Sequence, residues 1–185
     1  MNIERVPQKH YPKADITRRA MAWGVDFLGV WLLSSIFGSA EAGIQVVQIL
    51  VFVIGWLIAR VVVVYNNQGQ SLGRWAFDLK LLETQNGQVV ARIPDLQSLL
   101  KREAIIGFGA LLVSIAIGNI IRNPTAILLV IPLAIDCGVA LSDTQMQQAL
   151  HDRYVETMIV SSRRGYSLDI KVKQLVDKMR RDVRR

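Results

Sequence analysis

Three charged side chains lie inside long apolar stretches of this 185-residue sequence, where charge is costly. They are Asp26, Arg60 and Asp136. Carboxylates in such positions commonly mark the path of a transported proton or cation. An arginine between two carboxylates can equally form a fixed ion-pair clamp, because each unpaired charge would be expensive in an apolar interior. These residue types therefore support either an ion-handling site or a structural clamp, and we favour the clamp.

The stretches that must position these charges are long enough to cross a bilayer. The chain is 51% hydrophobic with a mean hydropathy of +0.30, which is too apolar for an ordinary soluble domain of this length. We predict an all-α membrane protein with four transmembrane helices arranged as two helical hairpins, at residues 20–40, 44–64, 104–121 and 125–141. The membrane domain would cover residues 20–160, between an N-terminal segment, 1–19, and a tail, 161–185.

A polar insert, residues 66–103, separates the two predicted hairpins of helices. Asn86-Gly87 stands between two strand-like stretches of this insert, which is a strong signal for a β-hairpin. Asp95 is a suitable N-cap for a helix that leads into the third span. After the fourth span, residues 153–162 are typical of an apolar-rich strand or of an interfacial segment beneath the spans. The insert is therefore expected to be ordered.

The basic residues indicate the orientation of the spans. The leading segment and the insert carry five lysines or arginines each and the segment after the fourth span carries ten, whereas the loops on the opposite side contain only Arg122. By the positive-inside rule, both termini and the insert are predicted to be cytoplasmic. This topology accounts for the net charge of +7, so we predict no nucleic-acid partner.

The same topology places the three intramembrane charges at one level. With about 1.5 Å of rise per residue, Asp26, Arg60 and Asp136 lie roughly 9, 6 and 8 Å from the cytoplasmic ends of their spans. The simplest arrangement is a cluster in which Arg60 bridges Asp26 and Asp136.

Two further motifs contain polar residues that could act at a site. Backbone amides beside Gly69 and Gly73, together with Arg74, resemble an anion nest, although a structural turn is the simpler interpretation. His151-Asp152 has no accompanying nucleophile motif. We interpret it as a cytoplasmic polar latch in which Asp152 accepts hydrogen bonds from the backbone or from Arg19. No enzyme activity, catalytic residue, metal or cofactor is predicted.

The tail carries apolar residues at helical spacing and bases over most of its remaining surface. This pattern is typical of a basic amphipathic helix. Such a helix can lie on anionic lipid headgroups or dock on an acidic partner. The alternative is a solvated, partly disordered terminus. The apolar positions are Leu168, Val172, Leu175, Val176, Met179 and Val183.

Four motifs, in this order around the spans, resemble the RDD family of bacterial membrane proteins, which is named for one arginine and two aspartates. They are RRAMAWGVD, GQSLGRWAFDLKLLE, LLKRE and QALHDRYVETMIV, and the resemblance covers roughly residues 15–160. It implies that the family arginine is Arg19 or Arg18, that the first aspartate is Asp26, and that the second is Asp136 or Asp152. Gly73-Arg74 departs from the usual Gly-Lys of the family but conserves the charge.

Two function classes remain open. The family resemblance implies a membrane protein for which transport has been proposed, with ion/proton antiport reported for some relatives. We favour a non-catalytic scaffold, accessory subunit or assembly factor that binds other integral membrane proteins or its own copies within the bilayer. The alternative is a small ion/proton transporter that uses the buried aspartates. The expected location is the bacterial plasma membrane or, from a similarity to cyanobacterial members, a thylakoid membrane with a photosynthetic complex as partner.

Overall fold

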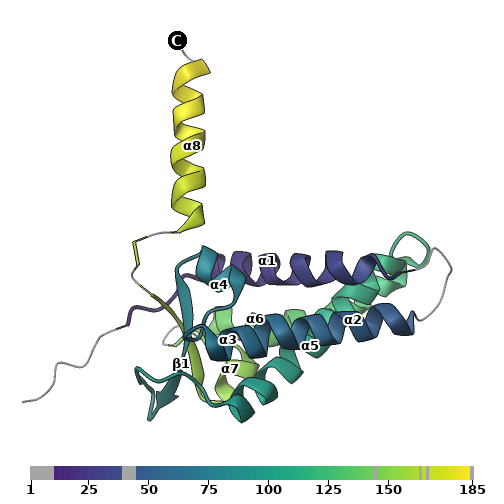
Figure 1. Cartoon of the computed structure of the whole chain (residues 1–185), viewed down its shortest axis with the longest axis horizontal. Coiled ribbons are helices and arrows are strands. Elements are labelled where there is room, and N and C mark those ends of the chain that lie inside the picture. Colours follow the sequence, from purple (N-terminus) through teal and green to yellow (C-terminus); the bar gives the residue numbers. More distant parts are fainter. Residues whose placement is uncertain (1–10, 39–44, 144–145, 163, 166, 184–185) are drawn as a thin grey trace, which may run out of the picture.

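Long helices running side by side form most of the molecule in the computed structural model, which describes residues 11–38, 45–143, 146–162, 164–165 and 167–183 (Figure 1). Most of the predicted N-terminal segment and the loop between the first two predicted spans lie outside the described residues. The helices are α1 (Ile16–Ser35), α2 (Val46–Leu57), α3 (Val63–Asn66), α4 (Leu72–Ala76), α5 (Leu96–Asn119), α6 (Ile131–Ser142), α7 (Leu150–Tyr154) and α8 (Leu168–Val183), with a π-helical turn η1 (Ile58–Val62) and a 3-10 segment η2 (Pro124–Val130).

A small antiparallel sheet covers one end of the helices (Figure 1). Its strands are β1 (Leu79–Gln85), β2 (Gln88–Val89) and β3 (Thr157–Ser161), in the order β2-β1-β3. Asn86 and Gly87, with φ of 52° and 74°, form the turn between β1 and β2, as their sequence predicts. β3 pairs with β1 in the register Leu81 to Ile159, so the segment after the last long helix closes onto the insert.

Two helical segments are long and apolar enough to cross a membrane, namely Val46–Asn66, which joins α2, η1 and α3, and Pro124–Ser142, which joins η2 and α6. They coincide with the second and fourth predicted spans. The helices at the first and third predicted spans, α1 and α5, have ionised side chains close to their starts, including Arg18, Arg102 and Glu103. Length and composition therefore support two of the four predicted spans, and the spans at α1 and α5 stay predictions.

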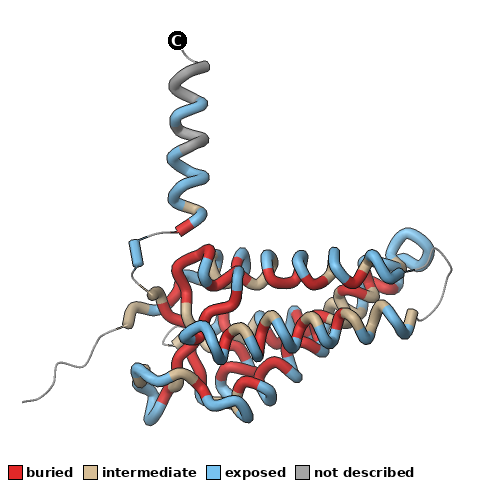
Figure 2. The backbone as a smooth tube through the Cα atoms, viewed as in Figure 1, coloured by how far each residue is buried: buried red, intermediate tan, exposed pale blue. Residues whose placement is uncertain are grey.

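The interior of the long helices is aromatic and aliphatic. Trp23 stacks on Phe27 at 5.0 Å between ring centroids, and Phe52 stacks on Trp56 at 5.9 Å. Ile106 and Ala110 of α5 complete this cluster. Figure 2 shows the buried residues on the inward faces and the exposed residues on the outward faces. Many of the exposed residues are large and apolar, which is the pattern of a surface that contacts lipid.

α8 projects away from the rest of the molecule and runs crosswise to the long helices (Figure 1). Its start is held by an ion pair between Arg18 of α1 and Asp169, at 2.9 Å. Leu168, Val172 and Met179 of its apolar stripe are 42%, 49% and 55% exposed. The tail is therefore helical, as predicted, and the described part of its apolar face lies open.

Candidate functional site

A network of buried ion pairs occupies the sheet end of the helices, and Arg60 lies at its centre. Arg60 Nη1 donates to Asp26 Oδ2 at 2.7 Å, and Arg60 Nε donates to Glu103 Oε2 at 3.2 Å. The guanidinium also lies 5.3 Å from the centroid of the Trp56 ring. The π-helical turn η1 carries Arg60, and insertions of this kind are frequent at functional sites. Three helices, α1, η1 and α5, are thus joined by one side chain.

Asp26 accepts three hydrogen bonds, and only one of them comes from Arg60. Ser71 Oγ donates to Oδ2 at 2.6 Å, and the backbone N–H of Gly73 donates to Oδ1 at 2.7 Å. The close approach requires glycine, because a Cβ at Gly73 would lie 2.0 Å from the carbonyl oxygen of Ala22. The start of α4 is therefore docked directly on the Asp26 carboxylate.

Glu103 is shared by three guanidiniums. Arg60, Arg74 and Arg102 all contact this carboxylate, with Arg74 Nη2 at 3.4 Å from Oε1. Burial raises the pKa of Glu103, but Arg60, Arg102 and Arg74 outweigh burial and hold the pKa at about 2. Glu103 therefore carries a stable negative charge at neutral pH.

Asp152 of α7 forms the second hub of the network. Arg102 Nη2 donates to Oδ1 at 2.8 Å, and Arg19 Nη2 donates to Oδ2 at 2.8 Å. Burial raises the pKa of Asp152, but the positive charges of Arg102 and Arg19 outweigh burial and keep it well below its usual range. The contact with Arg19 is the one that the sequence predicts for the latch.

His151 connects this hub to Asp136 of α6. The backbone N–H of His151 donates to Asp136 Oδ1 at 3.0 Å, and its Nδ1 lies 2.5 Å from Oδ2. On its other side, His151 Nε2 lies 3.1 Å from Arg102 Nη2. Arginine can only donate, so Nε2 must accept and the proton must sit on Nδ1, directed at Asp136. This geometry assigns a neutral imidazole between Arg102 and Asp136.

The family model of the RDD family matches residues 13–156 of the chain, a segment that contains every member of this network. The chain belongs to the RDD family. The match confirms the resemblance carried by the sequence motifs, and RDD proteins are bacterial membrane proteins, in agreement with the apolar helices. Searches of the curated proteins and of the solved structures return no match.

The RDD arginine and aspartates expected from the sequence fall into this one network. Arg19 pairs with Asp152, whereas Asp26 pairs with Arg60. Arg18, the other candidate for the family arginine, lies outside the network and pairs with Asp169 at the base of α8.

The prediction that Arg60 bridges Asp26 and Asp136 is wrong for Asp136. Arg60 pairs with Asp26 as predicted, but its second carboxylate is Glu103. Asp136 lies beside His151 instead. The physical reason is that α5 packs against η1 and carries Glu103 to Arg60, while α7 packs against α6 and carries His151 to Asp136.

The glycine-rich loop forms a structural turn whose anion is supplied by the chain itself. The Gly73 amide binds Asp26, and Arg74 is buried against Glu103. Gly69 has a φ of 82°, and its carbonyl accepts from Leu81 N at 2.9 Å, which ties the loop to β1.

Sequence reasoning missed Glu103 and Arg102 as members of the site and used Arg102 only as an indicator of orientation. Both side chains are fully buried. A signal for them exists in the sequence, because Lys101-Arg102-Glu103 opens an apolar run of α5 where one acidic residue follows two basic ones. Such a run can supply ion-pair partners as readily as it marks a membrane boundary.

Proposed function

We propose that this RDD protein is a non-transporting membrane scaffold, an accessory subunit or assembly factor of a larger membrane complex. The main support is the state of its four buried carboxylates. Asp26, Glu103 and Asp152 are each bound by at least one guanidinium, and Asp136 is bound by His151. A carboxylate held by permanent positive charge does not exchange protons easily, so the three carboxylates bound by arginine suit a clamp that fixes the helices.

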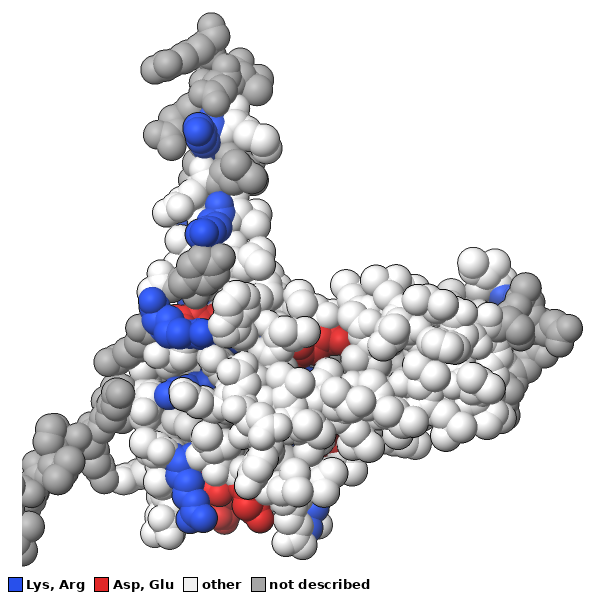
Figure 3. Space-filling view, viewed as in Figure 1, with Lys and Arg blue, Asp and Glu red and all other residues white. Residues whose placement is uncertain are grey.

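The proposal includes a topology of four spans, with α1 and α5 crossing the bilayer beside the two apolar segments. α5 has 24 residues, and at 1.5 Å per residue its length of about 36 Å exceeds the hydrocarbon thickness. In Figure 3 basic side chains gather at the sheet end and along α8, while the surface over the long helices is largely free of charge. By the positive-inside rule, the sheet end faces the cytoplasm.

The proposed partner surface at the cytoplasmic side is α8. A helix that runs crosswise to membrane-spanning helices would lie along the membrane plane (Figure 1). Its exposed apolar residues and its lysines, including Lys173 and Lys178, suit contact with anionic headgroups or with an acidic face of a neighbouring protein.

The experiment compares the full chain with a chain that lacks residues 165–185, each solubilised in mild detergent from the native membrane. We expect the full chain to migrate within a larger complex and the truncated chain to migrate alone, with the same melting temperature. The matched control is Arg92→Gln, a surface arginine with a 73% exposed side chain, which should stay in the complex. If the full chain migrates alone, the scaffold proposal is wrong.

A transporter is the second candidate, and one observation favours it. Asp136 has a histidine as its partner, and histidine is the side chain whose charge most readily changes near neutral pH. In this alternative, His151 and Asp136 would pass a proton in exchange for a cation. A proton flux carried by the purified protein alone would support it.

A further inference from the structure

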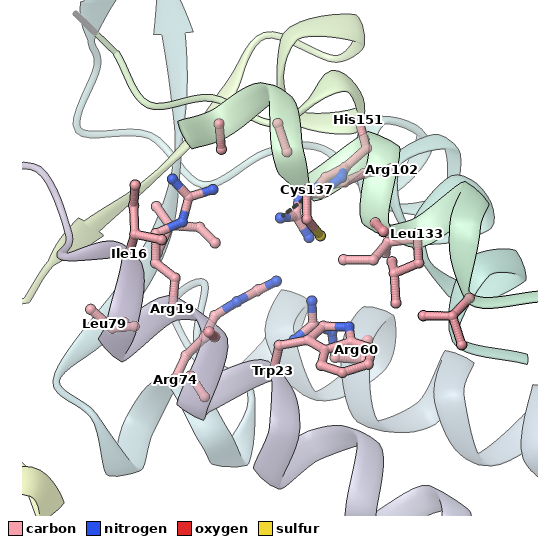
Figure 4. Close-up of a pocket in the computed structure, with 18 residues that line it drawn as sticks. Ile16, Arg19, Trp23, Arg60, Arg74, Leu79, Arg102, Leu133, Cys137 and His151 are labelled. Carbon is pink, nitrogen blue, oxygen red and sulfur yellow. Dashed lines mark hydrogen bonds between the residues drawn. The ribbon is translucent and has the colours of Figure 1, made fainter. Parts of the chain in front are cut away.

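A cavity of about 300 Å³ lies beside the ion-pair network, at the level of the buried charges. Figure 4 shows the residues around it. α1 contributes one wall with Ala20 and Trp23, and α6 contributes the facing wall with Ala134 and Cys137. Its volume is at the lower end of the range of roughly 300–1,000 Å³ that is typical of ligand pockets.

The charged residues that line the cavity are all basic. Arg19, Arg60, Arg74 and Arg102 line it together with His151, whereas no aspartate or glutamate among the described residues does so. The cavity therefore presents cationic and apolar groups to whatever enters it.

Arg74 is the guanidinium with the least compensation. Four arginines share three carboxylates, and the single ion pair of Arg74 is the long contact of 3.4 Å to Glu103. Within the described part of the chain, Arg74 Nε and Nη1 are buried without a hydrogen-bond partner. Burial, and then repulsion from Arg60 and Arg102, lower the pKa of Arg74 well below its usual range. In Figure 4 its side chain reaches toward the middle of the cavity.

A second unpartnered donor lies on the cavity wall. Trp23 Nε1 is buried and has no acceptor among the described residues. A buried N–H without a partner costs about 1–3 kcal/mol. The unpartnered guanidinium nitrogens of Arg74 and this indole N–H give the cavity donors that suit an oxyanion.

The apolar walls belong to helices that pack on different neighbours. α1 packs on α2 and α4, whereas α6 packs on α5 and α7. The cavity therefore lies on a seam between two halves of the molecule. Ala20 and Ala134, one on each side of this seam, are exposed on the outer surface and also line the cavity. In the proposed topology, this seam faces lipid near the cytoplasmic end of the spans.

We propose that this cavity binds the phosphate of an anionic phospholipid, with Arg74 as the main ligand and the start of an acyl chain along the seam between α1 and α6. A phosphate oxygen accepts from Arg74 Nε and Nη1 and supplies the acceptors that this guanidinium lacks. The small side chains at Ala20 and Ala134 leave room for the chain. A soluble phosphate offers the same oxygens but makes no use of the apolar walls.

The test uses the purified full chain in a neutral detergent, incubated with phosphatidylglycerol, with phosphatidylcholine or with inorganic phosphate. Bound lipid is counted by native mass spectrometry, and the melting temperature is recorded with and without each ligand. Arg74→Gln removes the proposed ligand, and Ala134→Trp fills the seam without touching an ion pair. Arg92→Gln is the matched control because it removes a surface arginine on the strand side.

We expect the wild type and Arg92→Gln to retain phosphatidylglycerol in preference to phosphatidylcholine and to melt at a higher temperature with it. Arg74→Gln should lower the affinity for phosphatidylglycerol roughly tenfold, a change equivalent to about 1.4 kcal/mol. Ala134→Trp should reduce retention as well while the protein stays folded.

Three outcomes would overturn the proposal. The first is equal retention of the two lipids by the wild type. The second is full retention of phosphatidylglycerol by a folded Ala134→Trp variant. The third is binding of inorganic phosphate that matches that of phosphatidylglycerol and is unchanged by Ala134→Trp, because the occupant would then be a soluble oxyanion.

Discussion

The two aspartates of the long helices, Asp26 on α1 and Asp136 on α6, are both buried and are held in different ways. Asp26 accepts from a guanidinium, a hydroxyl and a backbone amide within 2.7 Å. Asp136 accepts from the backbone and the ring of His151. Fixed positive charge therefore compensates the first carboxylate, whereas a neutral imidazole oriented by Arg102 satisfies the second.

This difference shows that two buried acids on neighbouring long helices need not share one partner. On the Asp26 side, removal of Arg60 leaves Asp26 without a guanidinium and takes one of three guanidiniums from Glu103. On the Asp136 side, an amide in place of the carboxylate would leave no cation without a partner, because the donors to Asp136 carry no net charge. The free-energy cost of a substitution should therefore differ strongly between the two sides.

The largest effect is expected for Arg60→Ala. Removing one partner of a buried ion pair typically costs about 3–5 kcal/mol, because the remaining charge has no compensation. The combined change Asp26→Asn and Arg60→Gln removes the directly bonded pair, leaves Glu103 with Arg74 and Arg102, and should restore a substantial part of the melting temperature. Arg92→Ala, on the surface, should melt like the wild type. If Arg60→Ala melted at the wild-type temperature, the claim that fixed positive charge stabilises the Asp26 side would be contradicted.

Acidification should weaken the Asp26 side next. The pKa of Glu103 in the folded protein is about 2, below its ordinary value of 4.5, so its contribution is fully present above about pH 4.5 and is lost as the pH falls toward 2. The melting temperature, measured in steps from pH 6 to pH 2.5, should decrease as the pH drops below about 4.5. The melting temperature of Glu103→Gln should decrease less steeply with falling pH. A decrease as steep as that of the wild type would contradict the low pKa assigned to Glu103.

Gly73→Ala should cost less than Arg60→Ala but should act on the same carboxylate. The added Cβ would meet the Ala22 carbonyl oxygen and force α4 away from α1, which breaks the Gly73 amide bond to Asp26. Overpacking of this kind typically costs about 1–3 kcal/mol. Gly87→Ala is a control with open space but a positive φ, so it should lose only the smaller cost of backbone strain.

The smallest effect is expected for Asp136→Asn. The amide oxygen can still accept from the backbone N–H of His151, and only the ring Nδ1–H would lose its acceptor, so the cost should be about 1–3 kcal/mol with no charge left uncompensated. Measured beside Asp26→Asn, this variant should melt at the higher temperature of the two. The reverse order would show that Asp136, and not Asp26, is the more tightly held acid.

Much of the local structure could be predicted from the sequence because short-range rules set it. The turn at Asn86-Gly87 needs two residues that tolerate positive φ, and Asp95 caps α5 by accepting from Ser98 N at 3.1 Å. The pairing of Arg60 with Asp26 followed from depth alone, since a buried charge requires a partner at its own level.

The rest of the site depends on packing between distant segments. Whether Arg60 meets Glu103 or Asp136 is decided by the neighbours of α5 and α6, which hydropathy along the chain does not report. Arg74 and Arg102 carry the sequence signature of a cytoplasmic surface, yet both are buried, Arg74 against Glu103 of α5 and Arg102 against Asp152 of α7. The cavity between α1 and α6 likewise has no signature in the sequence.

The central claim is that the buried charges form a fixed clamp and carry no ions. The most direct measurement reconstitutes the purified protein into liposomes that contain a pH-sensitive dye and applies a sodium, potassium or proton gradient. We predict that proton movement in these liposomes equals that in empty liposomes under each gradient. A cation-dependent proton flux that disappears in Asp26→Asn or Asp136→Asn, and persists without residues 165–185, would contradict the account.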